Sequence, residues 1–375
     1  MSGLFQSLEI GKNALLSQQF SLQTISHNIA NSDTPGYTRQ RVVMSTSYPQ
    51  QSNVGMIGSG VQVDTIVQIR DLFLGQQYRD AQMSYGEWAY KEKIYTQIES
   101  VFNEPNDNSL NDLLNNFWDS WSQLATNSDS SDNREVILAQ ANQLINGFQQ
   151  MAWSLESLRE SIDSDITSMT YEINNLTTEI ANLNAQIQVS ELGGVTANDL
   201  RDARDLLLDE LSNFIDVNTI EQPNSSTSVY IGSMVLVDGT QSFDINTVTV
   251  NDNGQPINRL IWAGSEVELR NNNGQLSGLL EMRDQTVVEY QKKLDEMAAT
   301  LVTEVNALHR SGYAADGSTS VNFFDPNYTT ASTIRLNSEI ETDTNKIVAS
   351  QGQDSDNLIA LAIYDLRDVR IMSSG

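Results

Sequence analysis

The feature that most constrains the fold is a long run of apolar residues at helical spacing in the middle of the chain. Between Leu144 and Ile187, apolar residues recur in steps of three or four that average about 3.6 over 43 residues. A repeat of 3.6 matches a straight α-helix with little supercoil. Residues 133–190 are therefore predicted to form one helix of roughly 85 Å at 1.5 Å per residue.

Local signals predict where this helix begins and where the chain returns. Asp132 followed by Glu135 has the spacing of a capping box and is predicted to open the long helix. Thr196 with Asp199 is predicted to cap a return helix over residues 199–214. Together the two helices are expected to form an antiparallel helical body.

From about residue 217 to 275 the apolar period changes from 3.6 to two. The runs SVYIGSMVLV and INTVTV are rich in β-branched residues, and Asp-Gly and Asn-Gly pairs separate such runs. A small antiparallel β domain inserted between helices is therefore predicted. The NDNG stretch at 251–254 lacks the alternating ligands and the final glutamate of a calcium loop, so a hairpin turn is expected there. A second long helix is predicted from Val287 to Leu308.

The first thirty residues carry a different pattern, a strict seven-residue repeat. We call the repeating positions the seam. They are Leu4, Leu8, Gly11, Leu15, Gln18, Leu22, Ile25 and Ile29, and all except Gly11 and Gln18 are large and apolar. A heptad seam is typical of a helix that packs against another helix. Thr34, Pro35 and Gly36 are predicted to end the helix, because the residue before proline avoids the α region and glycine accepts a positive φ.

The partner of the seam is not evident from the sequence. It could dock on the body of this same chain, or it could be covered by other polypeptide. One narrow apolar stripe does not offset the entropy of ordering the whole segment, so residues 1–36 are expected to be disordered in the isolated chain and to become helical where neighbours cover them.

Composition limits the possible functions. The formal charge of -28 lies almost wholly after residue 70, since residues 1–70 carry about +1, and such an acidic surface disfavours nucleic acid and anionic membranes. The chain has no cysteine and two histidines, which excludes thiolate chemistry and makes a histidine-rich metal site improbable. No apolar run approaches the roughly 20 residues of a membrane helix, and no cleaved signal peptide is evident at the start.

No catalytic, cofactor or metal motif stands out. The P-loop, the dinucleotide glycine fingerprint, G-x-S-x-G and H-E-x-x-H are all absent from the sequence. Trp118 and Trp121 lie in a helical apolar stripe and are expected in the core. For His27, a local hydrogen bond at the helix end is a better interpretation than a metal ligand. The many acidic residues are interpreted as solvated helix faces, with a carbohydrate-cleaving pair of carboxylates as the remaining enzymatic alternative.

The stretch ISHNIANSDTPGYTRQ, residues 25–40, resembles the N-terminal signature of bacterial flagellar axial proteins. Its TPGYTRQ ending is most similar to the hook-associated protein 1 family, which forms the first hook–filament junction. The opening motif is shared with rod and hook subunits, so the combination with later segments makes the resemblance specific. Those further segments are GSGVQVDTIVQIRDLFLGQQYRDA (58–81), DLRDARDLLLDELS (199–212), LVDGT (236–240) and the stretch from GQLSGLLEMRDQ to NALHRSGY (274–313).

The resemblance implies a structural protein without enzymatic activity or cofactor. It would leave the cell through the flagellar type III apparatus and polymerise through its terminal helices into a ring between hook and filament. Implied partners are copies of itself, the hook protein, the next hook-associated junction protein and an export chaperone. The implied assembly residues are Leu4, Leu8, Leu15, Leu22, Ile25, Asn28, Ile29, Asn31, Thr34, Pro35, Gly36, Tyr37, Arg39 and Gln40. His27 stands where the family commonly has asparagine.

The expected fold class is α+β and mainly α, an elongated multi-domain protein with long antiparallel helices and a small β insertion. One departure from the family is its end, DVRIMSSG, which predicts that the long C-terminal helices and the region bound by the chaperone are missing. A sister rod or hook subunit is the structural alternative, disfavoured by the long helices. The expected organisation is an N-terminal helix (1–36), an extended connector (37–85), the helical body (86–216), the β domain (217–278), the return helix (279–312) and a polar connector with the start of a further helix (313–375).

Overall fold

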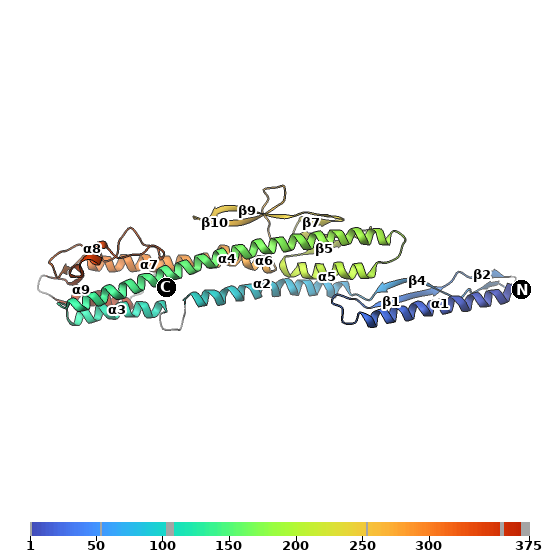
Figure 1. Cartoon of the computed structure of the whole chain (residues 1–375), viewed down its shortest axis with the longest axis horizontal. Helices are drawn as coiled ribbons and strands as arrows, with labels where there is room; N and C mark the ends of the chain where they lie inside the picture. The colour runs from blue at the N-terminus through green and yellow to red at the C-terminus, as the bar shows by residue number, and fades with distance from the viewer. Residues whose placement is uncertain (1, 53–54, 103–108, 253, 353–355, 369–375) are drawn as a thin grey trace. The chain divides into compact units, whose positions relative to one another are not determined.

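The computed structural model describes residues 2–52, 55–102, 109–252, 254–352 and 356–368 (Figure 1). The chain forms two compact units, one made of residues 1–90 and 165–279 and the other of residues 91–164 and 280–375. The predicted end segment DVRIMSSG lies outside the described residues from position 369 onward. The fold is mainly helical with small antiparallel sheets, so the predicted fold class is confirmed.

Three helices contribute residues to both units. They are α2 (Leu72–Phe102), α4 (Ser131–Glu191) and α6 (Gln275–Glu281). None of the described helices combines the length and apolar character that a bilayer crossing requires.

The predicted central helix is present as α4, a helix of 61 residues. The apolar positions that predicted it are buried, apart from the half-buried Leu183. The predicted capping box was wrong, because the helix begins earlier and the hydroxyl Oγ of Ser130 accepts a hydrogen bond from the amide of Asn133 at 3.2 Å. Asp132 instead lies in the first turn, where its negative charge interacts favourably with the positive end of the helix dipole.

The return helix is α5 (Asn198–Phe214), but its predicted cap was also wrong. Ala197 occupies the cap position and no side chain bonds the first free amides of the helix. The amide of Ala197 donates to Oε1 of Glu191 at 2.9 Å. The carboxylate of Asp199 is not available for capping, because side chains from the N-terminal part of the chain bind it.

The β insertion of the first unit consists of a four-stranded antiparallel sheet and a separate hairpin. The sheet contains β5 (Asn218–Glu221), β6 (Thr227–Ile231), β7 (Met234–Asp238) and β8 (Gln241–Ser242), and the hairpin pairs β9 (Ile245–Asp252) with β10 (Gln255–Trp262). Gly232, at φ +56°, splits the run SVYIGSMVLV into β6 and β7. Asp252 pairs with Gln255 and the amide of Gly254 donates to Oδ1 of Asn251 at 2.8 Å, so the hairpin prediction for NDNG is confirmed.

The N-terminal part of the first unit is a helix beside a β hairpin. Helix α1 (Ser2–Ala30) contacts β1 (Gln40–Thr46) and β4 (Val61–Gln68), which pair antiparallel, and Figure 1 shows the helix running along them. The short strands β2 (Gln50–Ser52) and β3 (Gly55–Ile57) pair with each other. We refer to β1 through β4 as the N-terminal hairpin.

Helix α2 begins at Leu72, well before the position near Trp88 where helical spacing resumes in the sequence. Its first turn exposes three consecutive apolar residues, Leu72, Phe73 and Leu74, and the large Tyr85 and Trp88 are also exposed. A helix with apolar residues on its outer side has no clear hydrophobic period. The pattern therefore did not reveal this helix start.

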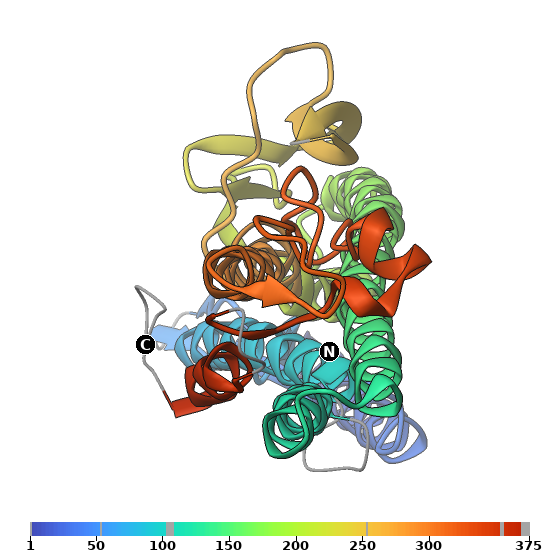
Figure 2. The same cartoon turned by 90° about the vertical axis from the view of Figure 1, so that its left-hand side faces the viewer.

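The second unit packs helices around a turn-rich C-terminal segment. Besides its parts of α2 and α4, it contains α3 (Leu110–Thr126), α7 (Val287–His309) and α9 (Leu358–Asp365), and Figure 2 shows α9 lying beside α3. Shorter elements are η1 (Met282–Thr286), β11 (Tyr313–Ala314), α8 (Ser338–Thr342), η2 (Thr344–Lys346), β12 (Val348–Ser350) and η3 (Leu366–Asp368).

The predicted second long helix is present as α7, and a π-helical turn, η1, precedes it. It lies between α6 and α7 and carries Arg283, which is 2% exposed and ion-paired to Asp163 at 2.7 Å. The carbonyl of Arg283 accepts a hydrogen bond from Nε of Arg159 at 3.1 Å. The π turn thus carries a carbonyl that lies within hydrogen-bond distance of Arg159.

The core of the second unit contains a cluster of aromatic rings. Trp121 is fully buried, Trp118 is nearly so, and both lie close to the ring of Phe117. The rings of Phe323 and Phe324 complete the cluster. The core interpretation of the two tryptophans is therefore confirmed.

His309 is fully buried beside this cluster and links two backbone segments. Its Nδ1 donates to the carbonyl of Val321 at 2.8 Å, and its Nε2 accepts from the amide of Val348 at 3.0 Å. This bonding requires the neutral ring. Burial lowers the pKa of His309 from 6.5 to about 4.

This burial predicts an acid-sensitive second unit. The unfolded chain binds a proton at His309 near its ordinary pKa of 6.5, whereas the folded chain resists it down to about 4. The stability from this group is therefore fully present above pH 6.5 and is lost as the pH falls towards 4, by up to about 3 kcal/mol. His309→Gln should weaken the pH dependence of the urea-unfolding midpoint between pH 6.5 and 4, measured by tryptophan fluorescence.

The other histidine supplies the matched control. His27→Gln, in the first unit, should leave the acid dependence of the tryptophan transition unchanged. An acid dependence in the His309→Gln protein equal to that of the parent would contradict the role given to the buried ring.

Candidate functional site

Helix α1 directs a polar side towards the N-terminal hairpin. Ser17 and Thr24 are 3% and 7% exposed, and the hydroxyl of Thr24 donates to the carbonyl of Phe20 at 3.0 Å. A Cβ placed on Gly60 would lie 3.2 Å from Cγ2 of Ile10, so the helix and the hairpin approach closely there. Glycine at position 60 permits this approach, and the side of α1 that the hairpin covers is mainly polar, with Ile10 as an apolar member.

The seam lies on the outer side of α1 and is uncovered. Leu8 is 72% exposed, Leu15 74%, Leu22 64%, Ile25 52% and Ile29 69%. Gly11 and Gln18 are exposed with them. Leu4 belongs to the helix by its backbone, but its side chain lies outside the described part of the structure.

Three further exposed apolar residues widen this surface, and the heptad pattern missed them. Phe5, Leu16 and Phe20 are 69%, 42% and 47% exposed. They fall outside the strict repeat, so their spacing did not mark them. Their exposure follows from the position of the hairpin, which the sequence does not specify.

The seam residues of α1 are therefore not docked on the first unit, to which the helix belongs. Each aliphatic side chain of this kind contributes roughly 1.5–3 kcal/mol when it is taken out of water. Several exposed together on one helix form the kind of surface that marks an interaction site.

Asn28 joins the end of α1 to the start of β1. Its Oδ1 accepts from the amide of Gln40 at 2.9 Å, and its Nδ2 donates to the carbonyl of Gln40 at 2.9 Å. The hydroxyl of Tyr37 also donates to Oδ1 of Asn28, at 2.7 Å. We call these contacts the Asn28 clasp, which brings the predicted residues Asn28, Tyr37 and Gln40 together.

Burial, and then the charges of Asp199 and Asp202, raise the pKa of Tyr37 above its ordinary value of 10.0. The phenol therefore stays protonated at neutral pH and remains a donor. The negative charges around it favour this protonated form.

The turn after α1 reverses the chain through residues 31–36. The hydroxyl of Thr34 donates to Oδ1 of Asn31 at 3.2 Å, and the amide of Asn31 donates to the carbonyl of His27. Pro35 and Thr34 are exposed. Gly36 has φ +77°, and a Cβ there would lie 3.0 Å from Cβ of Leu206 on α5. Both conformation and space require glycine at this position.

His27 has the predicted local contact and one distant contact. Its Nδ1 lies 3.2 Å from Nδ2 of Asn31, and its Nε2 lies 3.3 Å from Oδ1 of Asp199 on α5. The edge of the Tyr37 ring packs near its imidazole. No group of three or more histidine, aspartate or glutamate residues suited to a metal ion occurs within the described ranges.

Arg39 and Gln40 have different surroundings. The Arg39 side chain is exposed, while its carbonyl accepts from the amide of Ile69 at 2.8 Å. The side chain of Gln40 donates to Oδ1 of Asp199 at 2.7 Å. The predicted site residues thus fall into an exposed group on α1 and a hydrogen-bonded group in the turn.

A groove beside the β insertion does not suit glycoside chemistry. This groove of about 490 Å³ lies between α4 and β9 and is lined mainly by threonine and asparagine. Asp244 is the one carboxylate among the described residues that line it. A paired-carboxylate mechanism needs two such groups at a defined separation. The candidate site of this fold is therefore the uncovered seam of α1, a surface of the kind through which a helix packs against other polypeptide.

Comparison with known proteins identifies the family. Residues 95–324 match the family described as "Flagellar hook-associated protein FlgK helical domain", and residues 8–38 match "Flagella basal body rod protein". The chain belongs to the flagellar hook-associated protein FlgK family. The family resemblance inferred from the sequence is confirmed, and the carbohydrate-cleaving alternative is wrong because the family is structural.

Individual relatives agree with this assignment. Flagellar hook-associated protein 1 of Bacillus subtilis (strain 168) is 30% identical over 359 residues, covering 87% of this chain and 71% of that protein. The protein of the same name from Salmonella typhimurium is 29% identical over 86% of this chain and 59% of its own length. The solved flagellar hook junction protein FlgK from Burkholderia pseudomallei is 26% identical, with a TM-score of 0.58 over 66% of this chain and 46% of its own.

The turn geometry generates a prediction about Gly36. Gly36→Ala places a Cβ against Leu206 in an unfavourable φ region, which should loosen the turn by about 1–2 kcal/mol. The amide of Gln40 within the Asn28 clasp should then exchange its hydrogen roughly 5–30 times faster, measured by NMR or mass spectrometry. Gly193→Ala is the matched control, because a Cβ there meets nothing within 4 Å. Unchanged exchange at Gln40 in the Gly36→Ala protein would contradict this role of the glycine.

Proposed function

We propose that this chain is a structural subunit of the junction between flagellar hook and filament, and that it assembles through the seam of α1. The observation that carries this proposal is the exposure of five aliphatic seam residues, each more than half exposed. The relatives are named flagellar hook-associated protein 1 and flagellar hook junction protein, and these names support assembly at a junction of the hook.

The proposed mechanism is helix packing without a covalent step, cofactor or metal. A seven-residue apolar repeat fits the groove of a neighbouring helix in knobs-into-holes fashion. The proposed partners of the seam are the corresponding helices of further copies of this chain in a ring. Subunits of the hook lie on one side of that ring and those of the next hook-associated protein on the other. An export chaperone is the proposed partner before assembly.

Ordering of the N-terminal helix is proposed to accompany assembly. The hairpin covers the mainly polar side of α1, and burial of Ser17 and Thr24 contributes little hydrophobic free energy. We restrict the proposed disorder in the free chain to residues 2–27, because the Asn28 clasp and Gly36 hold the following turn to β1 and α5. Neighbouring helices would supply the missing apolar contacts.

A pair of substitutions in the seam tests assembly. Leu15→Glu with Leu22→Glu places two charges on the packing surface, so the protein should remain folded but lose incorporation at hook tips by at least tenfold. The measurement is immunogold electron microscopy of a strain that carries only the variant, in the full-length protein.

Gln23→Glu, an exposed change beside the seam on the same helix, is the matched control and should incorporate normally. Circular dichroism and thermal unfolding should be the same for both purified variants. Incorporation of the double seam variant at the control level would exclude the seam as the assembly surface.

Solution measurements on the free chain test the proposed disorder. Amides of residues 2–27 should exchange hydrogen close to the rate of an unstructured peptide, because few buried contacts protect them. Amides in the middle of α4 should exchange at least a thousandfold more slowly, which serves as the internal control. Slow exchange throughout residues 2–27 in the monomer would refute coupled folding and assembly.

A further inference from the structure

Helix α5 presents a row of carboxylates on one side. Asp199, Asp202, Asp205 and Asp209 follow one another at spacings of three or four, which places them on the same helical face. We call these four residues the acidic row. Each of them contacts a residue between positions 27 and 79.

Asp202 is the most buried member, at 5% exposure, and both of its oxygens are used. Oδ2 accepts from the backbone amide of Thr38 at 2.9 Å, and Oδ1 accepts from Nε2 of Gln68 at 2.8 Å. Thr38 lies just before β1, and Gln68 is the last residue of β4. One buried carboxylate therefore ties the two ends of the N-terminal hairpin to α5.

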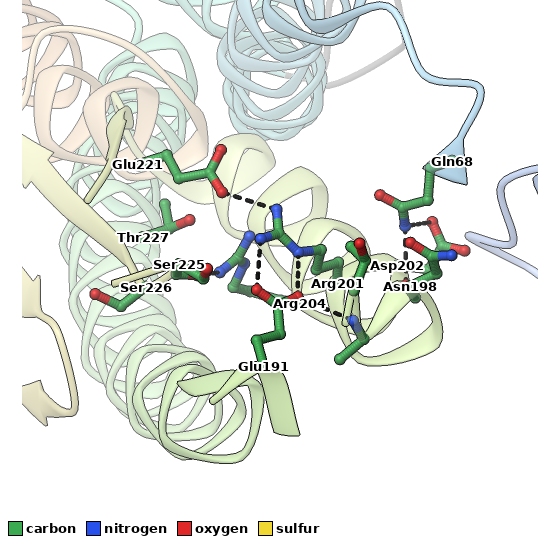
Figure 3. A network of polar contacts seen from close by, with 12 residues as sticks. Gln68, Glu191, Asn198, Arg201, Asp202, Arg204, Glu221, Ser225, Ser226 and Thr227 are labelled. Atoms are coloured by element: carbon green, nitrogen blue, oxygen red, sulfur yellow. Dashed lines mark hydrogen bonds and ion pairs between the residues drawn. The ribbon is translucent and has the colours of Figure 1, made fainter. Parts of the chain in front are cut away.

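Neighbouring residues in the first turn of α5 reinforce this attachment. Nδ2 of Asn198 donates to the carbonyl of Ile66 in β4 at 2.8 Å, and the carbonyl of Asn198 accepts from Nε2 of Gln68 at 2.8 Å. Figure 3 shows Gln68 directed towards both Asn198 and Asp202. Asp199 holds Gln40 of β1, as described above.

The rest of the row fixes the segment that follows the hairpin. Nη1 of Arg70 lies 3.0 Å from Oδ2 of Asp205, and Nε of Arg79 lies 2.7 Å from Oδ1 of Asp209. The side chain of Arg79 is 8% exposed, so its ion pair is shielded from water. The row thus contacts the turn, both hairpin strands and the first part of α2 in sequence along one helix.

We propose that the acidic row of α5, and Asp202 in particular, positions the N-terminal hairpin on the first unit and thereby directs α1. Asp202 is a positioning residue, since it is buried and both of its carboxylate oxygens bind the ends of the hairpin. This inference deepens the proposed function. The positioning of the hairpin stands by itself, and only its purpose, to orient α1 for assembly, rests on the proposed function.

The charge of the Asp202 carboxylate explains why this one residue contributes so much to holding the hairpin in place. Hydrogen bonds to an ionised group contribute about 1.5–3 kcal/mol each, more than those between neutral groups. Burial raises the pKa of Asp202, while the bonds from Thr38 oppose that rise. Loss of the carboxylate would leave the amide of Thr38 without this acceptor and would remove one of the two acceptors of the Gln68 side chain.

The absence of native cysteine allows a direct distance measurement. Spin labels on Thr46→Cys in β1 and Glu179→Cys in α4, both exposed positions, report the place of the hairpin relative to α4 in the full chain. Double electron–electron resonance should give one narrow distance distribution for the parent. Asp202→Ala should at least double its width, and Glu210→Ala, an exposed acid on the same helix outside the row, should leave it unchanged.

A second variant removes the same bonds from the hairpin side. Gln68→Ala loses the contacts with Asp202 and Asn198 without altering α5, so it should also broaden the distribution even if Asp202→Ala fails to fold. Widths equal to the parent in Gln68→Ala and in folded Asp202→Ala would overturn the proposal. The measurement uses the unassembled chain, so its result is independent of the seam variants, whose normal incorporation would refute the proposed function instead.

Discussion

Burial of one continuous apolar stripe on α4 is the constraint on which the rest of the structure depends. A helix of this length cannot cover its own stripe, so other elements of each unit must supply that cover. In the first unit, α5 and the β insertion meet this need, and in the second unit α3, α7 and the aromatic cluster do so. The π turn at Arg283 and the buried ring of His309 are local adjustments that satisfy polar groups within this packing.

Helix α1 shows the opposite arrangement. Its small polar residues face the hairpin while its aliphatic seam faces outward, which inverts the usual distribution of a surface helix. The inversion is consistent with a helix whose hydrophobic contacts are supplied by other polypeptide. The acidic row of α5 complements it, because polar contacts at the hairpin can hold the segment in place while leaving the seam uncovered.

The sequence predicted the elements with strong periods and missed those without them. The long helix, the return helix and the β insertion each carry a clear apolar period, and all three are present. The start of α2 was missed because exposed apolar residues such as Phe73 obscure its period. Both predicted caps were displaced, since a cap depends on which residue begins the helix, and the Asp199 carboxylate is bound by distant side chains instead.

By itself, the sequence determined the apolar repeat of the seam, the turn built on Pro35 and Gly36, and the family to which the chain belongs. These features are local or nearly local in sequence, so spacing and residue type suffice to recognise them. Only the tertiary structure decided which side of α1 remains exposed and which carboxylates of α5 hold the hairpin. Asp202 is separated from Thr38 by 164 positions, and no local pattern encodes a contact over that distance.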